Sequence, residues 1–244
     1  MMICDAHCHL DLLDDMVGCI NEMKNYNMCL YAVGTTPKAY NREMQLCKNY
    51  RNINVGLGMH PQLVSSGYDD MHLFRTLFAT SHYIGEVGLD FSKEYIGNKE
   101  TQIKVFSEII ELCERYGEKV VSIHSLKSAN TVIEILREYR KQKNNKYIFH
   151  WFTGSFSQME RAIELGCYFS INSRMLKTKS GIEVAKAVPF DRMLLETDTP
   201  FAFKAKHISE IEKELRGLVS KISKLVGKDI SEIIDENVKT VFQF

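Results

Sequence analysis

Two histidines near the start of the chain have the spacing of a metal-binding pair. His7 and His9 follow the apolar run ICDA. In a β-strand, residues i and i+2 point to the same side, so both imidazoles can reach one cation. Because the preceding run is apolar, the pair leaves the core rather than a surface loop. Asp5 lies on the same side, one step deeper, and we expect it to be a hydrogen-bond partner or a buried structural carboxylate rather than a ligand.

A glutamate in the first half of the chain has an apolar setting. Glu86 stands in the segment IGEVGLD, after Gly85 and shortly before Gly88. Burying such a carboxylate costs free energy unless a positive charge pairs with it. A carboxylate that bridges two metal ions meets this need, and we predict that role for Glu86. Asp90 follows in the loop and is predicted to be a turn or orienting residue.

Three further candidates follow apolar runs in the second half of the chain. His124 ends KVVSIH, His150 ends YIFH, and Asp198 lies just past RMLLE. A single histidine after an apolar strand is usually a packing residue, but two at equivalent strand ends favour ligands. We expect Asp198 to hold one metal ion and to accept a proton from the water molecule that attacks the substrate in a hydrolysis. Glu196, inside the same strand, is predicted to be structural.

The remaining histidines have different settings. His60 ends the apolar run in GLGMHPQ, and we expect it to face the same opening and to contact a phosphate oxygen. The histidines at positions 72, 82 and 207 lack such a context and are predicted to be surface or packing residues.

Together, these runs carry a mixed set of imidazoles and carboxylates. The set comprises His7, His9, Glu86, His124, His150 and Asp198. Such donors suit Zn, Mn, Fe or Ni. Two ions about 3.5–4 Å apart can clamp a phosphodiester, position an attacking water and stabilise the leaving oxygen. We therefore expect two divalent ions that share Glu86 as a bridge.

Short apolar runs alternate with amphipathic runs along the chain. We predict strands at 3–7, 28–33, 53–57, 83–86, 119–123, 147–150, 167–171 and 193–196, and helices at 101–115, 129–139, 208–226 and 231–242. Eight strand–helix units in 244 residues predict an α/β fold, a (β/α)₈ TIM barrel forming one domain over residues 1–244. A doubly wound sheet shows the same alternation. It is disfavoured because no GxGxxG follows the first strand, and because polar residues follow many strands, where barrel enzymes carry their chemistry.

Composition excludes several classes of protein. The apolar share is 45% and the charged share 25%, as in an ordinary globular chain. Thirty-one basic residues balance 31 acidic ones, which excludes a polycation that coats nucleic acid. The seven cysteines contain no CxxC pair and predict reduced thiols in a cytoplasmic protein. Neither a signal peptide nor a membrane span is expected.

Six segments together carry a family resemblance. In order, they are DAHCHL, GLGMHP, IGEVGLD, VSIHS, FHWFTGS and LLETDTPF. They closely resemble the TatD family of metal-dependent deoxyribonucleases, from Asp5 to the closing NVKTVFQF. The resemblance implies a TIM barrel, two divalent ions (Mg, Mn or Zn) on the six residues named above, and hydrolysis of DNA. Family members often act as 3′-to-5′ exonucleases on single-stranded ends. The family's third-strand histidine corresponds to His60.

The chain departs from the family pattern after the fifth strand. Leu126 and Lys127 stand where the family usually has an arginine. We predict that Lys127 contacts phosphate, although a lysine cannot give a bidentate fork. Arg174, after the seventh strand, is a further cation near the expected mouth. With the extra tryptophan in HWFTGS, these features resemble the TatD-like nucleases of bacterial anti-phage (Qat-type) gene clusters, which implies partner proteins of a defence cluster.

Two alternative functions use the same barrel. One is an amidohydrolase that cleaves C–N bonds or lactones. Many such enzymes bridge their metals with a carbamylated lysine, and no lysine stands at the end of the fourth strand. The other is a metal-binding scaffold subunit of a defence complex, for which six intact ligands would not be needed.

Overall fold

The computed structural model describes residues 2–64, 70–141 and 144–242. Within these residues the chain forms eight short strands. They are β1 (Ile3–Cys8), β2 (Met28–Val33), β3 (Ile53–Gly56), β4 (Tyr83–Gly88), β5 (Val120–His124), β6 (Lys146–His150), β7 (Tyr168–Ile171) and β8 (Met193–Leu195). Each lies within about two residues of a strand predicted from the apolar runs.

The strands close into a barrel in chain order. Parallel pairing joins neighbouring strands in two sheets. One sheet has the order β1-β2-β3 and the other the order β4-β5-β6-β7-β8. At one seam Leu57 forms a parallel bridge with Ile84. At the other, the Asp198 amide donates to the His7 carbonyl at 2.9 Å. The fold is therefore the predicted (β/α)₈ barrel, and the doubly wound alternative is wrong because such a sheet stays open and reverses its strand order.

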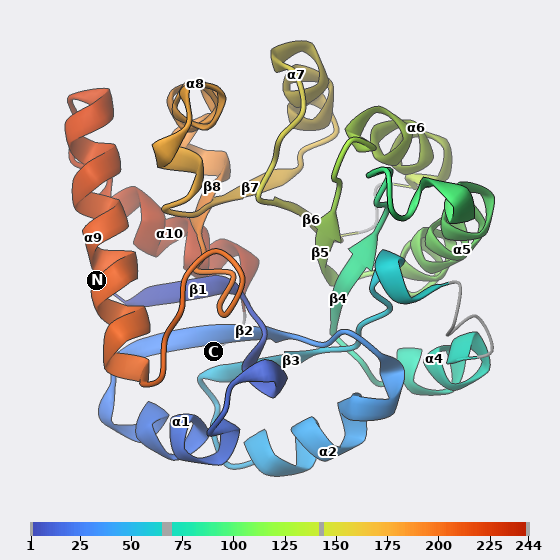
Figure 1. Cartoon of the computed structure of the whole chain (residues 1–244), viewed down its shortest axis with the longest axis horizontal. Helices are drawn as coiled ribbons and strands as arrows, with labels where there is room; N and C mark the ends of the chain where they lie inside the picture. The colour runs from blue at the N-terminus through green and yellow to red at the C-terminus, as the bar shows by residue number, and fades with distance from the viewer. Residues whose placement is uncertain (1, 65–69, 142–143, 243–244) are drawn as a thin grey trace.

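Helices surround the strands as an outer ring (Figure 1). They are α1 (Met16–Glu22), α2 (Pro37–Cys47), α4 (Met71–Phe78), α5 (Lys99–Tyr116), α6 (Ala129–Tyr139), α7 (Phe156–Glu164), α8 (Lys179–Ala187), α9 (Ile208–Val226) and α10 (Ser231–Val241). Short 3₁₀ turns lie at η1 (Leu10–Leu12), η2 (Met23–Asn25), η3 (Pro61–Leu63), η5 (Ile96–Asn98), η6 (Met175–Lys177) and η7 (Phe190–Arg192). The four helices predicted from periodicity agree with α5, α6, α9 and α10 to within about two residues.

Local sequence explains where these helices begin and end. In α5, the buried side chains of Val105, Phe106, Ile109 and Ile110 recur at helical spacing and pack on the barrel. The helix ends at Gly117, whose φ of 75° suits a residue without a side chain. Helix α7 begins with a capping box between Ser155 and Gln158.

The strands are buried on both faces, as expected for parallel strands between helices and a barrel interior. The seven cysteines are buried free thiols, which agrees with the prediction of unbridged cysteines. None of the helices in the described residues combines the length and the apolar character that a bilayer crossing needs.

Candidate metal centre

The carboxyl ends of the strands bring the predicted ligands to one mouth of the barrel. His7 lies in β1, Glu86 in β4, and His124 and His150 end β5 and β6. His9 and Asp198 follow β1 and β8 within a few residues. Parallel strands place their carboxyl ends on one side, where barrel enzymes carry their chemistry. All these residues except His124, which is half-buried, are buried.

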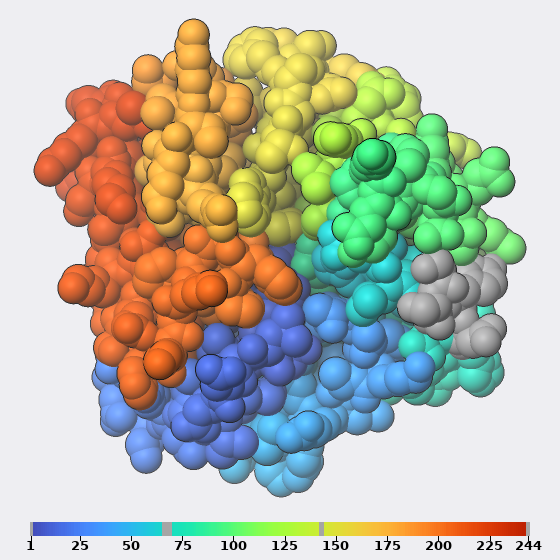
Figure 2. Space-filling model, in the orientation of Figure 1, coloured from blue at the N-terminus to red at the C-terminus, as the bar shows by residue number. Residues whose placement is uncertain are grey.

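Segments from distant parts of the chain border the mouth. The segment between β8 and α9, orange in Figure 1, crosses in front of the strands. Figure 2, from the same side, shows a hollow near the centre where blue, orange, yellow and green segments meet. The site is thus assembled from both halves of the chain.

The two carboxylate oxygens of Glu86 face different histidines. Its Oε2 lies 3.4 Å from His7 Nε2 and 3.2 Å from His9 Nε2. Its Oε1 lies 2.8 Å from His124 Nδ1 and 3.0 Å from His150 Nε2. Glu86 therefore stands between two groups of donors, which is the position that a bridging carboxylate needs.

Asp198 belongs to the first of these groups. Its Oδ1 lies 3.7 Å from His7 Nε2 and 3.6 Å from His9 Nε2. These three residues offer donor atoms close enough together to share one cation. His60 joins the second group, because its Nε2 is 3.3 Å from Glu86 Oε1, and it forms a possible cation site with Glu86 and His124.

The charges of the buried cluster fit divalent cations. Burial would raise the pKa of Glu86, but His60, His150 and His7 outweigh it and hold that pKa well below the usual value. Burial opposes charge on His150, yet Glu86 and Glu196 raise its pKa well above the ordinary range. The carboxylates thus demand positive charge, which protonated imidazoles supply here and bound metals would supply in their place.

The orientation of His7 also fits a ligand. Its Nδ1 is hydrogen-bonded to the Ser122 hydroxyl at 2.7 Å, which leaves Nε2 facing His9 at 3.3 Å. Burial, together with the charge of His150, lowers the pKa of His7 well below its usual value, which favours the neutral imidazole. Two nitrogens that converge on one point, one of them neutral, suit coordination.

Carboxylates outside the cluster orient the histidines. Asp90 Oδ2 lies 3.1 Å from His124 Nε2 and accepts a hydrogen bond from Gln62 at 2.8 Å. Glu196 Oε1 lies 3.6 Å from His150 Nδ1 and accepts a hydrogen bond from Asn172 at 2.8 Å. Asp90 therefore has the orienting position predicted for it, and Glu196, predicted to be structural, also borders the cluster.

Asp5 ties the first and last strands together. Its carboxylate accepts hydrogen bonds from the amides of Thr197 at 2.9 Å and His7 at 3.2 Å, and from the Thr197 hydroxyl. Burial raises the pKa of Asp5 to about 7. It thus serves as the buried hydrogen-bond partner predicted for it, at the seam that carries His7 and Asp198.

Three non-glycine residues after the strands adopt left-handed backbone conformations. Lys127 has a φ of 55°, Trp151 of 39° and Asp198 of 47°. Such conformations are strained for bulky side chains and concentrate at functional sites. Lysine and tryptophan are rare in this region, so no local signal in the sequence identifies the conformations of Lys127 and Trp151.

Sequence reasoning missed some residues that shape the site. Ser122 could have been found, because it lies two residues before His124 in β5 and shares its side of the strand. Gln62 lies in the 3₁₀ turn η3 and Asn172 directly follows β7. Neither has a comparable signal, since their partners Asp90 and Glu196 follow other strands.

Two small pockets lie beside the cluster. One, of about 210 Å³, is lined by His124, Ser125, Leu126, His150, Trp151 and Thr153. The other, of about 220 Å³, has Trp151 and Arg174 in its lining. The predicted phosphate contact Lys127 is exposed and lines neither of them.

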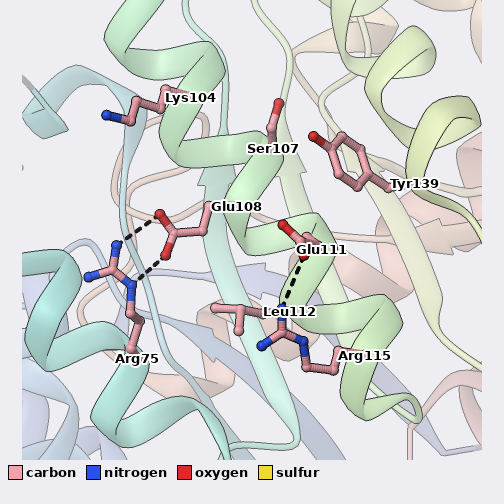
Figure 3. A pocket seen from close by; sticks show the side chains of 8 residues that line it. All are labelled: Arg75, Lys104, Ser107, Glu108, Glu111, Leu112, Arg115 and Tyr139. Carbon is pink, nitrogen blue, oxygen red and sulfur yellow. Dashed lines mark hydrogen bonds and ion pairs between the residues drawn. The ribbon is translucent and has the colours of Figure 1, made fainter.

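A larger hollow, of about 520 Å³, lies outside the barrel between α4, α5 and α6 (Figure 3). Its charges form ion pairs: Arg75 donates to Glu108 at 2.9 Å, and Arg115 to Glu111 at 3.1 Å. It contains none of the predicted site residues. Size alone therefore does not mark the functional site of this barrel.

Comparisons with known proteins bear on the family. The family model described as TatD related DNase matches residues 4–243. The deoxyribonuclease Tat-D of Schizosaccharomyces pombe is 36% identical over 117 residues, which cover 48% of this chain and only 37% of that protein. The human deoxyribonuclease TATDN3 is 28% identical over 250 residues, covering 95% of this chain and 90% of the relative.

A solved structure supports the same fold. The TatD homologue YJJV of Escherichia coli superimposes with a TM-score of 0.81, covers 98% of this chain and 97% of its own, and is 21% identical. At this identity the likeness concerns the barrel alone.

Proposed function

The chain belongs to the family of TatD-related DNases, and from this premise we propose that it is a metal-dependent deoxyribonuclease that hydrolyses phosphodiester bonds of DNA. The observation that carries the proposal is the position of Glu86, whose two carboxylate oxygens face separate groups of donors. This arrangement supports two cations per chain with Glu86 as their bridge.

The remaining predicted ligands divide between the two ions. His7, His9 and Asp198 would hold the first, and His124 and His150 the second. When bound, two such cations supply Lewis acidity to the phosphodiester and lower the pKa of water. His60, 3.3 Å from Glu86 Oε1, is proposed to contact a phosphate oxygen beside the second ion. We propose Mg, Mn or Zn as the metal.

Asp198 is the proposed proton acceptor. Burial raises its pKa to about 7, and the neighbouring carboxylates Glu196 and Glu86 add to that effect while His150 opposes it. Bound divalent cations would lower this pKa again and keep the carboxylate ionised, and they would also lower the pKa of the attacking water. Asp198 would accept a proton from the attacking water, while Ser122, Asp90 and Glu196 hold the histidines in place.

Finer properties are also proposed. We expect 3′-to-5′ exonuclease action on single-stranded ends, since a base inside a duplex can approach a narrow site only by leaving its stack. Leu126, Lys127 and Trp151 support membership of the anti-phage subgroup, with partner proteins from a defence gene cluster and a cytoplasmic location. The alternative of C–N or lactone hydrolysis gains no support from the cluster, where Glu86 and not a lysine stands between the donor groups.

The experiment is cleavage of end-labelled single-stranded DNA after chelation and reconstitution with Mg, Mn or Zn. Elemental analysis should find about two ions per chain. Glu86→Gln should lower the rate by at least about 10²-fold, the loss typical of a removed electrostatic stabiliser. The matched control is Glu108→Gln in the outer hollow of Figure 3, which should keep the native rate. Absence of both metal binding and cleavage after reconstitution would overturn the proposal.

A further inference from the structure

The pocket of about 210 Å³ is continuous with the candidate metal centre. His124 and His150, two proposed ligands, form part of its lining together with Leu126 and Trp151. Any group that enters it therefore contacts the histidines directly. A chemical group bonded to the scissile phosphate is the first candidate for that position.

The lining of this pocket suits a flat apolar group. Leu126 and Trp151 are the apolar residues of its lining, and apart from the imidazoles none of its lining residues is charged. A phosphate would find no cationic side chain of lysine or arginine there. Its volume is below the ~300–1,000 Å³ of sites that enclose drug-sized ligands, so it holds one small ring system rather than a base pair.

The backbone of Trp151 is held by the carboxylate that also lies beside His150. The Trp151 amide donates to Glu196 Oε1 at 3.1 Å, and that oxygen lies 3.6 Å from His150 Nδ1. The left-handed φ of 39° at Trp151 is costly for a bulky residue and persists only where the surroundings enforce it. One carboxylate thus holds both the backbone that carries the indole and a proposed ligand.

The arginine side chain of Arg174 lies near Trp151, in a second pocket. The second pocket, of about 220 Å³, includes both Trp151 and Arg174 in its lining. The Arg174 guanidinium donates to the Phe201 carbonyl at 3.2 Å, which holds it beside the mouth. Trp151 therefore separates an apolar pocket from one that offers an arginine, a pattern that matches a base followed by the next phosphate of a strand.

We infer that the pocket between Leu126 and Trp151 binds the nucleobase of the nucleotide at the scissile phosphate, stacked on Trp151, with Arg174 at the neighbouring phosphate. The inference rests on the proposed nuclease function and adds a specificity-determining residue to it. Stacking on an aromatic ring accepts any base, so the pocket selects unpaired nucleotides rather than a sequence.

Trp151 is the only tryptophan of the chain, so its fluorescence reports on this pocket alone. The metal-loaded protein is titrated with a single-stranded thymidine pentamer that carries slowly cleaved phosphorothioate linkages. A second titration uses an abasic deoxyribose pentamer with the same linkages. The thymidine strand should quench the fluorescence and the abasic strand should not. Equal quenching by both strands, or by neither, would overturn the inference.

Kinetics on an ordinary thymidine pentamer separate this role from a structural one. Trp151→Ala should raise KM about tenfold with little change in kcat, and Trp151→Phe should restore most of the loss because it keeps an aromatic face. The control is Phe156→Ala, an exposed aromatic that lines a different pocket, which should leave KM unchanged. Native KM in Trp151→Ala, with cleavage intact, overturns this inference only. No cleavage by the native chain with any of the three metals overturns the proposed function and this inference together.

Discussion

Two clusters of buried polar groups lie at opposite ends of the barrel and differ in how they are satisfied. At the amino ends of β5 and β6, Glu114 Oε1 accepts hydrogen bonds from Tyr147 at 2.6 Å and from Asn145 at 2.8 Å. Its Oε2 accepts one from the Lys141 amide at 2.7 Å. Each oxygen of this carboxylate meets a neutral donor, so the network needs no further charge.

The cluster at the carboxyl ends is only partly satisfied, because the buried His9 Nδ1 has no hydrogen-bond partner among the described residues. Glu86 meets ring nitrogens from several histidines, and Asp198 shares two of them. A fully satisfied buried network stabilises a fold, whereas a partly satisfied one is costly and persists where function requires it. The Glu114 network should therefore matter for stability, and the Glu86 cluster for metal binding and turnover.

The largest expected effect is on turnover by Asp198→Asn. The amide keeps the shape and one oxygen but removes the charge and the proton acceptor. Metal and DNA should still bind, while single-turnover cleavage falls by about 10²–10⁴-fold, the range for a lost acid–base group. Single-turnover cleavage at saturating metal, with a DNA-binding isotherm, measures both properties.

The two measurements separate the roles of Asp198. Near-native cleavage by the Asn variant would remove it from the mechanism. Loss of metal and DNA binding together would make it a ligand only. The control is Glu111→Gln in the outer hollow, which lies away from the barrel mouth and should change neither property.

The buried carboxylate of Glu43, in α2, extends the comparison of the Glu114 network with the Glu86 cluster, because neither of its oxygens has a hydrogen-bond partner among the described residues. Burial, with a smaller contribution from Asp11, raises its pKa from 4.5 to about 8. The folded state therefore binds a proton more tightly than the unfolded state does. Stability is full below about pH 4.5 and is lost as the pH rises towards 8.

Glu43→Gln should remove this part of the pH dependence. Between about pH 5 and 8, the free energy of unfolding of the native chain should fall by about 2–4 kcal/mol more than that of the variant. Denaturant unfolding at several pH values measures the difference, in which groups common to both proteins, such as Asp5, cancel. Parallel curves would show that Glu43 ionises normally.

A smaller effect is expected in the Glu114 network. Tyr147→Phe removes one hydrogen bond to a carboxylate and should cost about 1.5–3 kcal/mol of stability. Its DNA cleavage rate should stay native, because Tyr147 lies at the opposite end of the barrel from the cluster. Tyr116→Phe, which alters an exposed tyrosine, is the control for stability. A variant that loses turnover but not stability would reverse the assignment of the two clusters.

Much of the fold and of the candidate site is readable from the sequence for a local reason. Each strand is a short apolar run, and each proposed ligand stands at the end of such a run or just past it. The i, i+2 rule places His7 and His9 on one side without knowledge of any neighbour. Parallel strands then bring distant ends together, which is why Glu86 and Asp198 could be grouped.

The rest depends on contacts between strands that no local pattern encodes. The hydrogen bond between Ser122 and His7 depends on how β1 and β5 are positioned relative to each other along the barrel axis. The contacts of His60 with Glu86 and of Glu196 with His150 likewise depend on the relative positions of their strands along the barrel axis. No local pattern encodes the turn after β5 either, where Lys127 has a left-handed φ and is exposed while Leu126 lines the pocket. The phosphate contact of Lys127 stays a prediction.

The smallest expected effect concerns Lys127 and tests how far the binding surface extends beyond the cluster. With 31 basic and 31 acidic residues, affinity for DNA must come from the metals and a few local cations. Lys127 lies shortly after the end of β5 and its side chain is exposed. If it contacts one phosphate, Lys127→Ala should reduce the slope of log affinity against log salt by about one unit.

The variant should therefore bind single-stranded DNA more weakly than the native chain at low salt and almost equally at high salt. Lys221→Ala, an exposed lysine on α9, is the matched control and should leave the slope unchanged. Binding isotherms at several salt concentrations give both slopes. A salt-independent loss would show that Lys127 acts through the turn after β5 rather than through phosphate. An unchanged slope would leave Arg174, which lines the pocket beside Trp151, as the phosphate contact at this side of the mouth.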